Sequence, residues 1–240
     1  MPVTKSLVMT GVQWANVPLR PLNLKLQHQP QWDRDFKRWA RQGAGIADPN
    51  DVGDTDWASD LLTEGLEQHY LPLLKPDAVI VELGPGSGRL SRHLIGHCKK
   101  LISVDSSPYV CKWIRKYLDG KGSFEVHRLH GPHIPQLADG TVDAVVAHGV
   151  FEHLDLDETY WFLLEFARVL RPGGVCSFNF DTVATPDGIA ALREHRGPGQ
   201  RSVFRLHHPE SIRCVAKAVG YESVKITETP TRIAFADLTR

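Results

Sequence analysis

The sequence is poor in features that mark a secreted or membrane-spanning chain. Its four cysteines are scattered over 240 residues, and no two of them form a Cys-x-x-Cys pair. This pattern does not suit a disulfide framework or a thiolate metal site, so we expect the cysteines to be reduced and mostly buried. The sequence also lacks a run of about 18 apolar residues and a signal-peptide h-region. We therefore expect a cytoplasmic protein without membrane association.

The sequence also lacks an excess of charge of either sign. Lys and Arg together number 28, as do Asp and Glu. Proteins that bind polyanions typically carry a basic excess, so a nucleic-acid partner is disfavoured. The length suffices for one domain with an appendage. We expect an N-terminal arm and helical cap over residues 1–75, followed by a cofactor-binding domain over residues 76–240.

What the sequence does contain is a glycine-rich turn after a buried strand. The apolar run Ala78–Val81 predicts the strand, and Gly84, Gly86 and Gly88 follow it. A helix is then expected through His97. Glycines let the backbone turn sharply and approach a ligand closely, and a helix N-terminus offers free N–H groups. The turn therefore predicts a cofactor site, against the alternative of a glycine-rich turn that binds nothing.

The spacing of these glycines separates two classes of cofactor. A dinucleotide fingerprint requires Gly-x-Gly-x-x-Gly, and its third glycine, counted from Gly84, would fall on Arg89. The order found is acid-x-Gly-x-Gly-x-Gly, from Glu82 to Gly88. It resembles the first motif of the class I S-adenosylmethionine (SAM) methyltransferases. A nicotinamide dehydrogenase is correspondingly disfavoured.

An acidic residue ends the next apolar run. Leu101–Val104 predicts a second strand, and Asp105 follows it directly. In dinucleotide folds an acid roughly 20 residues past the glycines binds the ribose hydroxyls, and Asp105 suits the same task. Alternatively, Asp105 caps the following helix, which begins around Ser106–Pro108. A capping role would not exclude contact with a ligand.

Later segments extend the resemblance. Val142–His148 predicts a strand, Glu158–Leu170 an amphipathic helix and Val175–Phe180 another strand. The turn Arg171–Gly174 separates the last two, and Leu-Arg-Pro-Gly-Gly before a strand is typical of the family. The resemblance implies an α/β fold, in which a doubly wound, mostly parallel sheet of seven strands forms a Rossmann-like methyltransferase fold.

The two ends of the sequence complete this sheet and cover it. A helix from His208 to Val219 precedes the strands Glu222–Thr227 and Arg232–Ala236, which we expect to form a hairpin. Trp32–Gln42 and Trp57–Leu74 predict helices. In the family such N-terminal helices lie over the SAM site and shape the substrate pocket; the alternative is a packed cap without ligand contact.

In an open α/β sheet the ligand lies at the carboxyl ends of the strands, where the strand order reverses. By resemblance, the glycine turn and the segment His148–His153 face each other there. The family places residues near the donated methyl after the strand that ends at His148. The candidate catalytic residues are therefore His148, Glu152 and His153. The resemblance assigns cofactor binding to Glu82, Gly84, Gly86, Gly88, Asp105 and His148.

One family feature is missing. Many members carry an acid after the third strand that contacts the adenine amine, whereas this sequence has no acid between His127 and His133. His130 or backbone groups are the alternatives for this contact. A metal site formed by His127, His130 and His133 is disfavoured, because the three residues straddle a strand end and a proline turn.

Glu152-His153 also resembles part of a metal-binding cluster. Metal-assisted O-methyltransferases of the ubiquinone pathway and of small RNAs carry Glu-x-x-Glu-His, but Gly149 replaces the first acid here. The RNA enzymes have a further histidine downstream, in a place comparable to His207 and His208. The resemblance thus implies Mg²⁺ or another divalent cation held by Glu152, His153, His207 and His208. The alternative is that His207-His208-Pro209 only begins a helix.

Methyl transfer from a sulfonium mainly requires that nucleophile, carbon and sulfur be aligned. A hydroxyl acceptor additionally needs a base, a metal or both, whereas an amine needs only to be neutral. We expect SAM-dependent transfer to a small-molecule hydroxyl, on a sugar, a glycoside or a natural product. Methylation of an RNA end or terminal ribose is one alternative, and a catalytically silent SAM-binding partner is another.

Overall fold

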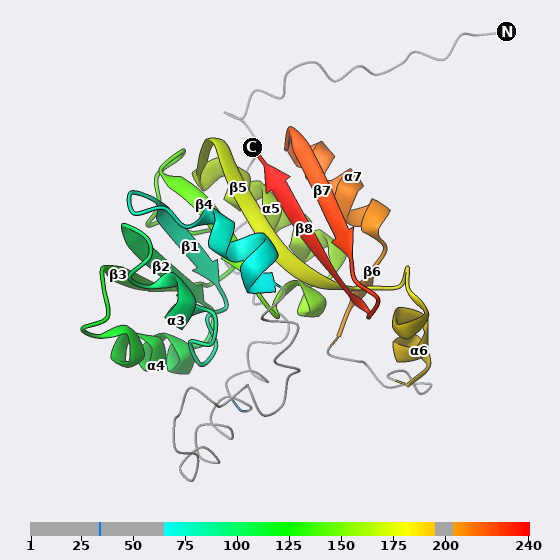
Figure 1. Ribbon diagram of the computed structural model, residues 1–240, viewed down its shortest axis with the longest axis horizontal. Coiled ribbons are helices and arrows are strands. Elements are labelled where there is room, and N and C mark those ends of the chain that lie inside the picture. Colours follow the sequence, from blue (N-terminus) through cyan, green and yellow to red (C-terminus); the bar gives the residue numbers. More distant parts are fainter. Residues whose placement is uncertain (1–33, 35–64, 195–203) are drawn as a thin grey trace, which may run out of the picture.

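The computed structural model describes residue 34, residues 65–194 and residues 204–240 (Figure 1). The N-terminal arm, the helix expected over Trp32–Gln42 apart from Arg34, and the first eight residues of the helix expected over Trp57–Leu74 lie outside these residues. The end of the latter segment forms a π-helical turn, η4 (Leu66–Tyr70), and a 3₁₀ turn, η5 (Leu71–Leu73).

A single sheet forms the centre of the described part (Figure 1). Its main path runs β3-β2-β1-β4-β5-β8-β7, and a two-residue strand pairs with β5 beside this path. The strand β8 is antiparallel to both of its neighbours, β5 and β7, and it forms the expected hairpin with β7. The strands are β1 (Val79–Leu83), β2 (Lys100–Asp105), β3 (Phe124–Arg128), β4 (Val142–Ala147), β5 (Leu170–Thr182), β6 (Leu206–His207), β7 (Ser223–Glu228) and β8 (Ile233–Thr239). The predicted doubly wound sheet is confirmed, with β6 as a short addition.

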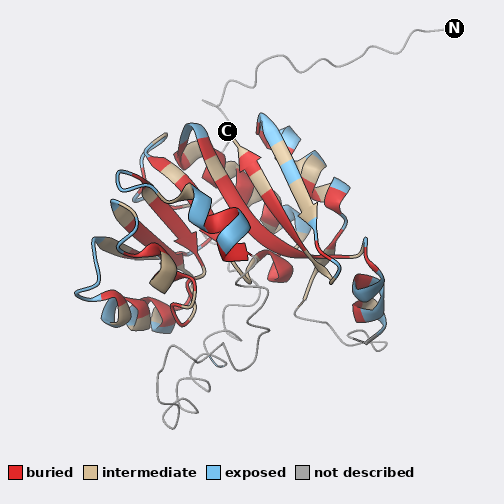
Figure 2. Cartoon of the chain, in the orientation of Figure 1, coloured by how far each residue is buried: buried red, intermediate tan, exposed pale blue. Residues whose placement is uncertain are grey.

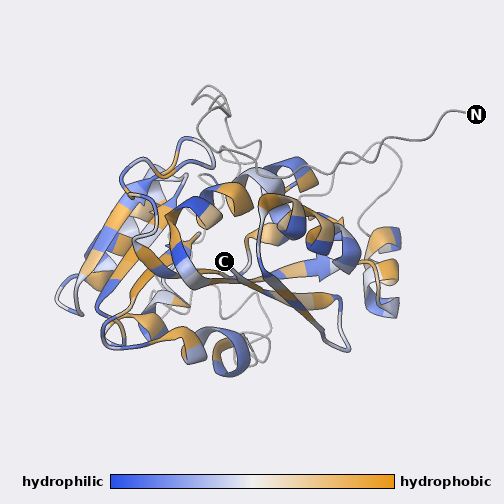
Figure 3. Cartoon of the chain, turned by 90° about the horizontal axis from the view of Figure 1, so that it is seen from above, coloured by the Kyte–Doolittle hydropathy of each residue, from blue (hydrophilic) through white to orange (hydrophobic). Residues whose placement is uncertain are grey.

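Helices cover both faces of the sheet, as Figure 3 shows from above. They are α3 (Ser91–Leu94), α4 (Pro108–Leu118), the 3₁₀ turn η6 (Phe151–His153), α5 (Leu156–Val169), α6 (Pro186–Glu194) and α7 (Pro209–Val219). The helices α5 and α7 pack on one face, while η4, α3 and α4 pack on the other. Because both faces are covered, the central strands are almost wholly buried (Figure 2).

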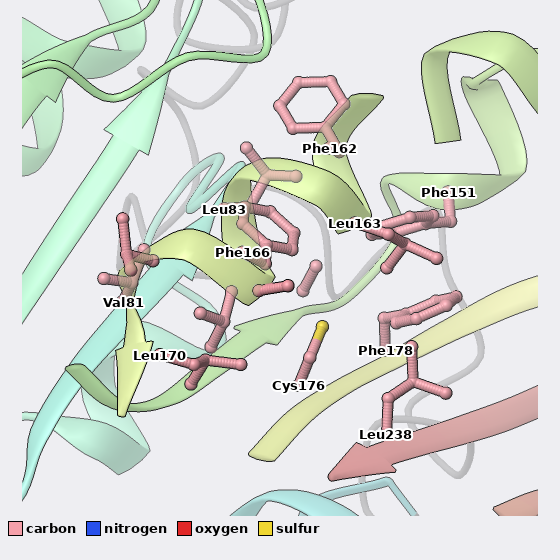
Figure 4. Close-up of a cluster of buried hydrophobic side chains, with 14 of the residues drawn as sticks. Val81, Leu83, Phe151, Phe162, Leu163, Phe166, Leu170, Cys176, Phe178 and Leu238 are labelled. Atoms are coloured by element: carbon pink, nitrogen blue, oxygen red, sulfur yellow. The ribbon is translucent and has the colours of Figure 1, made fainter. Parts of the chain in front are cut away.

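The core on the α5 face is rich in aromatic rings (Figure 4). Phe151 stacks on Phe178 with ring centroids 3.8 Å apart, and Phe162 and Phe166 approach from α5. Phe151 belongs to η6, so this stacking fixes η6 against β5. The sequence neighbours of both rings, Glu152 and Asn179, are thereby held at defined positions.

Two expected boundaries differ from the structure. The helix expected through His97 ends at Leu94, because Ile95 is extended and Gly96 has a φ of +83°, which a right-handed helix does not allow. The Arg171–Gly174 segment belongs to β5 instead of forming a separate turn. A register shift between Val142 and Ala144 of β4 accommodates these extra residues.

The helix that follows β6 confirms its expected limits. His208 caps α7 through its ring, and Gly220, with a φ of +104°, ends the helix. All four cysteines are free; Cys111 and Cys176 are buried, whereas Cys98 is half-buried and Cys214 is exposed. The described part of the chain contains no helix of the length and apolarity that a membrane crossing demands.

Candidate active site

The carboxyl ends of β1 and β4 lie side by side. The two strands are parallel neighbours, with Leu83 opposite Ala147. From β1 the chain proceeds to β2 and β3 on one side, and it returns to β4 on the other. The strand order therefore reverses between β1 and β4, as expected. The glycine turn and the segment His148–His153 leave the sheet at this point.

The three glycines of the turn are required for different reasons. All have positive φ, at +68° for Gly84, +54° for Gly86 and +99° for Gly88. A Cβ on Gly84 would lie 2.5 Å from Val150 Cγ2, and a Cβ on Gly88 would lie 2.5 Å from Tyr117 Cδ1. A Cβ on Gly86 would meet no atom within 4 Å. Packing thus explains Gly84 and Gly88, whereas Gly86 borders the open space that a ligand would need.

Glu82 lies beneath this turn and is buried. Its Oε2 accepts hydrogen bonds from Ser91 Oγ at 2.6 Å and from Ser103 Oγ at 3.2 Å. Among the described residues none donates to Oε1, and burial raises the pKa of Glu82 to about 7. Glu82 therefore ties β1 to β2 and α3 and supports the turn from below. Its contact with the cofactor stays a prediction.

Asp105 stands at the end of β2, next to the glycine turn. Gly84 N–H donates to Val104 O at 2.9 Å, which places Asp105 beside that turn. Asp105 Oδ1 accepts from Ser107 N–H at 2.7 Å. The cap of α4 is Ser107, whose hydroxyl accepts from Tyr109 N–H and Val110 N–H. Asp105 is thus not the helix cap; its carboxyl is oriented by the backbone.

His127, in β3, and His130 and His133, after it, do not converge. His127 Nε2 lies 3.0 Å from Glu125 Oε2, whereas His133 Nδ1 lies 3.0 Å from Glu165 Oε2. His130 is exposed. His127 and His133 therefore contact different acidic side chains, Glu125 and Glu165. A contact between His130 and adenine stays a prediction.

At the end of β4, His148 contacts the buried Tyr70 of η4. Tyr70 Oη lies 3.1 Å from His148 Nδ1 and 3.2 Å from Ala147 O. Burial, aided by the charge of Arg89, lowers the pKa of His148 to about 3. The imidazole is therefore neutral at working pH and is a weak base. It is suited to hydrogen bonding more than to proton abstraction.

Glu152 is the most strongly perturbed acid at this edge. Its side chain is buried at 2% exposure, and Oε2 accepts from Asn179 Nδ2 at 3.1 Å. Burial and then Asp181 raise the pKa of Glu152 to about 8, although Arg232 and Arg89 act in the opposite direction. An acid with such a pKa exchanges its proton near working pH, as acid–base catalysis requires.

His153 lies against Glu152 and an aromatic ring. Its side chain is 5% exposed, and Nε2 lies 3.8 Å from Glu152 Oε1. The ring centroid of Phe204 lies 5.1 Å away, and the guanidinium of Arg232 lies 5.4 Å from the same Phe204 ring. Arg232 is itself held by Asp181, with Nε and Oδ2 3.1 Å apart. Phe204, two residues before β6, therefore contributes its ring to the candidate site.

The four candidate metal ligands are not assembled, which corrects the expectation from sequence. His207 Nε2 donates to Leu154 O at 3.0 Å, and burial lowers its pKa. His208 Nδ1 accepts from Glu210 N–H at 3.2 Å and caps α7. Over residues 65–194 and 204–240, no three His, Cys, Asp or Glu side chains are grouped to hold a metal. The alternative, a helix N-terminus, holds for His208.

Sequence reasoning missed four residues that shape the site: Tyr70, Asn179, Asp181 and Arg232. A signal exists for two of them. Ser177, Asn179 and Asp181 alternate with apolar residues along β5, so they share the face opposite Phe178. Polar residues at this period near the carboxyl end of a buried strand indicate a polar site. Tyr70 and Arg232 carry no comparable signal.

Comparisons with known proteins agree with this geometry. A family model described as a methyltransferase domain matches residues 81–178, from β1 to β5. A SAM dependent methyltransferase from Aquifex aeolicus has a TM-score of 0.59 at 18% identity, over 80% of this chain and 98% of that one. Magnesium protoporphyrin IX methyltransferase from Synechocystis PCC 6803, with bound SAH (S-adenosylhomocysteine), has a TM-score of 0.62 at 15% identity, over 88% and 97%. A DhpI–SAH complex has a TM-score of 0.60 at 20% identity, over 87% and 94%.

Proposed function

We propose, for a chain that belongs to the class I SAM-dependent methyltransferases, that the methyl acceptor is a hydroxyl group of a small molecule. A sugar, a glycoside or a natural-product hydroxyl suits this proposal. The observation that carries it is the buried pair of Glu152 and His153 at the carboxyl edge of the sheet. A hydroxyl requires such a proton acceptor, whereas a neutral amine does not.

The residues beside β1 and β2 fit the cofactor. The open space over Gly86 lets a ligand approach the backbone, and Asp105 offers a carboxylate for ribose hydroxyls. When bound there, SAM supplies an electrophilic methyl group on a sulfonium. The chain has then only to orient the acceptor, exclude water and take up one proton.

We assign the proton to the pair of Glu152 and His153. As the C–O bond forms and the bond between the methyl carbon and the sulfonium sulfur breaks, leaving SAH, the acceptor hydroxyl loses its proton to His153, and the carboxylate form of Glu152 stabilises the resulting imidazolium. Since burial raises the pKa of Glu152 to about 8, the carboxylate becomes abundant only above neutral pH. Turnover is therefore expected to rise with pH up to about 8. His148, whose pKa is lowered to about 3, is assigned a hydrogen-bonding role at the cofactor.

An acceptor screen with methyl-labelled SAM tests this proposal. Panels of sugars and natural-product alcohols, of amines and of short RNAs should give labelled product with the alcohols alone. Product from amines, with a rate that does not depend on Glu152, would contradict it. RNA methylation with salt-sensitive binding would favour the RNA alternative. SAH binding without transfer to any acceptor would indicate a silent SAM-binding partner.

The metal-assisted version is tested separately with a chelator. Because His207 and His208 are engaged elsewhere, we expect chelation to leave turnover unchanged. Loss of activity that Mg²⁺ or Mn²⁺ restores would reinstate a divalent cation, and it would require His207 or His208 to change partners.

A further inference from the structure

Asn179 links two groups of the segment that follows β4. It lies on β5 with 2% exposure, and its Oδ1 accepts from Gly149 N–H at 2.8 Å. Its Nδ2 donates to Glu152 Oε2 at 3.1 Å. A backbone N–H can only donate, so the amide atom that faces Gly149 must be the oxygen. The amide nitrogen is then necessarily turned toward Glu152.

This orientation determines how Glu152 can carry a proton. Oε2 receives the amide N–H and therefore acts as the carbonyl-like oxygen of a neutral carboxyl group. The proton then belongs on Oε1, which is the oxygen 3.8 Å from His153 Nε2. We propose that Asn179 is a positioning residue that keeps the Glu152 proton on Oε1, facing His153. Asn179 touches neither acceptor nor cofactor in this role and acts through Glu152.

The surroundings of Glu152 are consistent with a carboxyl group that is often protonated. Burial is the largest influence and raises its pKa to about 8. The charged or titratable groups around it come from η4, the glycine turn, η6, β5 and the β7–β8 turn, and they are Tyr70, Arg89, His153, Asp181 and Arg232. Asp181 favours the proton and the two arginines oppose it. The hydrogen bond from Asn179 reaches one particular oxygen, Oε2, so we assign the selection between the two oxygens to Asn179.

The inference rests on the proposed role of Glu152 and His153 in proton transfer. In that role the carboxylate of Glu152 faces the imidazolium of His153, so the oxygen that gives up its proton when Glu152 ionises has to be Oε1. A proton on Oε2 would instead point at the Asn179 amide, away from His153. The hydrogen bond to Gly149 fixes Asn179 in turn, which couples the segment after β4 to the protonation state of Glu152.

The test is a direct titration of Glu152 in the full-length protein. Glutamate carboxyl carbons are labelled with ¹³C, and the Glu152 resonance is identified by its disappearance in Glu152→Gln. Asn179→Asp keeps an oxygen for Gly149 N–H but puts a carboxylate where Glu152 Oε2 receives a donor. Asn179→Ala removes the donor without adding charge. Ser177→Ala is the matched control, because Ser177 shares the face of Asn179 but donates to Asp237 Oδ1.

We expect the Glu152 midpoint to rise by roughly one pH unit or more in Asn179→Asp, and by less in Asn179→Ala, since a donor to the charged form is lost. Ser177→Ala should leave the midpoint where it is. An unchanged midpoint in either Asn179 variant, with thermal unfolding showing a folded protein, would overturn the proposal. If Asn179→Asp does not fold, Asn179→Ala decides alone.

The pH dependence of turnover is a second measurement, and it distinguishes a failure of the positioning role from a failure of the proposed function. In Asn179→Ala the alkaline rise of the methyl-transfer rate should move with the Glu152 midpoint, while the KM for SAM is unchanged. If the Glu152 midpoint shifts as expected in both Asn179 variants but the protein methylates no alcohol, the positioning role of Asn179 stands and the proposed hydroxyl chemistry is wrong. If the protein methylates alcohols but the midpoint does not shift, the hydroxyl chemistry stands and the positioning role is wrong.

Discussion

The carboxyl edge of the sheet contains two regions that are built in opposite ways. The cofactor half, which we define as Gly84–Gly88 with Asp105, comes from two adjacent strand ends and relies on backbone shape. The acceptor half, defined as residues 148–153 with Asn179, Asp181 and Arg232, gathers side chains from β4, η6, β5 and the β7–β8 turn. The first depends on spacing along the chain, and the second on convergence in space.

This difference has a physical reason. In the proposed function the glycine turn binds SAM, which is the same molecule whatever the acceptor, so a backbone turn of fixed shape suffices to hold it. An acceptor differs between enzymes, and its recognition requires side chains whose charge and protonation can be adjusted. The buried Glu152, with Asn179, Asp181 and Arg232 around it, is adjusted in this way. Mutations in the two halves should therefore affect different steps.

The largest expected effect is on cofactor binding, in Gly86→Val. The added side chain would occupy the open space over the turn, so SAH binding should be lost in calorimetry. Gly173→Val is the matched control, because Gly173 also has a positive φ, +74°, and a Cβ there would also meet no atom within 4 Å. Gly173 lies near the start of β5, at the opposite edge of the sheet.

Both variants carry similar backbone strain, about 1–2 kcal/mol or somewhat more for a branched residue. Their melting temperatures should therefore fall together, while only Gly173→Val binds SAH. Equal SAH affinity in the two variants would show that Gly86 does not border the cofactor. Gly88→Ala should be less stable than both, because its Cβ would clash with Tyr117.

Mutations in the acceptor half should lower turnover and leave SAH binding intact, the opposite of the effect of Gly86→Val. We expect His153→Ala to lower turnover by about 10²–10⁴-fold, the usual range for a lost general base, with SAH affinity little changed. His148→Ala should reduce turnover less, because the pKa of His148 is lowered to about 3 and its ring is a weak base. Glu152→Gln should remove the rise in turnover toward pH 8. Near-normal turnover in both histidine variants would leave a neutral amine as the better acceptor.

The sequence predicts the position of the glycine turn and of the neighbouring Asp105 because the determinants of both are local, whereas their contact with the cofactor stays a prediction. A glycine spacing and an acid at a strand end are visible in one window of the chain. The strands β1, β2, β4, β5, β7 and β8 were likewise predicted to within a few residues, with an exception at Arg171–Gly174, whereas no bounds were predicted for β3 and the short β6 was missed. At Arg171–Gly174 the bulge against β4 keeps a Pro-Gly-Gly segment in the sheet, and this pairing depends on a partner strand elsewhere in the chain.

The sequence identifies only some residues of the acceptor half, because its determinants are not local. Glu152 and His153 follow a strand end and could be selected, but their partners lie far away in the sequence. Asn179 contributes through an amide on another strand, and Arg232 through a turn near the C-terminus. The predicted set of metal ligands is not assembled for the same reason. His207 and His208 lie at the expected place in the sequence, but His207 Nε2 donates to Leu154 O and His208 Nδ1 accepts from Glu210 N–H.

The buried acid of the cofactor half should make stability depend on pH. The pKa of Glu82 is raised from 4.5 to about 7, so between these values the folded state binds more protons than the unfolded state. The contribution of Glu82 to the free energy of unfolding should therefore fall as pH rises from 4.5 to about 7 and then level off. Glu82→Gln should remove this contribution, leave the slope that Glu152 causes, and be more stable than the parent at pH 8 by roughly 2–4 kcal/mol.

Urea denaturation across this pH range measures the effect. Glu152→Gln is the matched comparison. Burial raises the pKa of Glu152 to about 8, so this variant should lose a part of the pH dependence that extends further toward alkaline pH than the part that Glu82 causes. An equal slope between pH 5 and 7 in the parent and in Glu82→Gln would show that Glu82 is ionised in the fold. The hydroxyls of Ser91 and Ser103 would then hold it as a carboxylate.

The smallest effect is expected at Asp105, where the two halves can be compared within one residue. Asp105→Ala should weaken SAH binding by roughly 1.5–3 kcal/mol, since hydrogen bonds from ligand hydroxyls to a charged acceptor are lost. It also removes the acceptor for Ser107 N–H, so part of the loss could arise from the loop. Asp105→Asn separates the two causes, because its amide oxygen still accepts from Ser107 N–H. If Asn restores the affinity fully, Asp105 acts by shaping the backbone, as the glycines do. If Asn binds SAH as weakly as Ala, the carboxylate itself contacts the ribose, and the cofactor half then uses one charged side chain in the way that the acceptor half uses several.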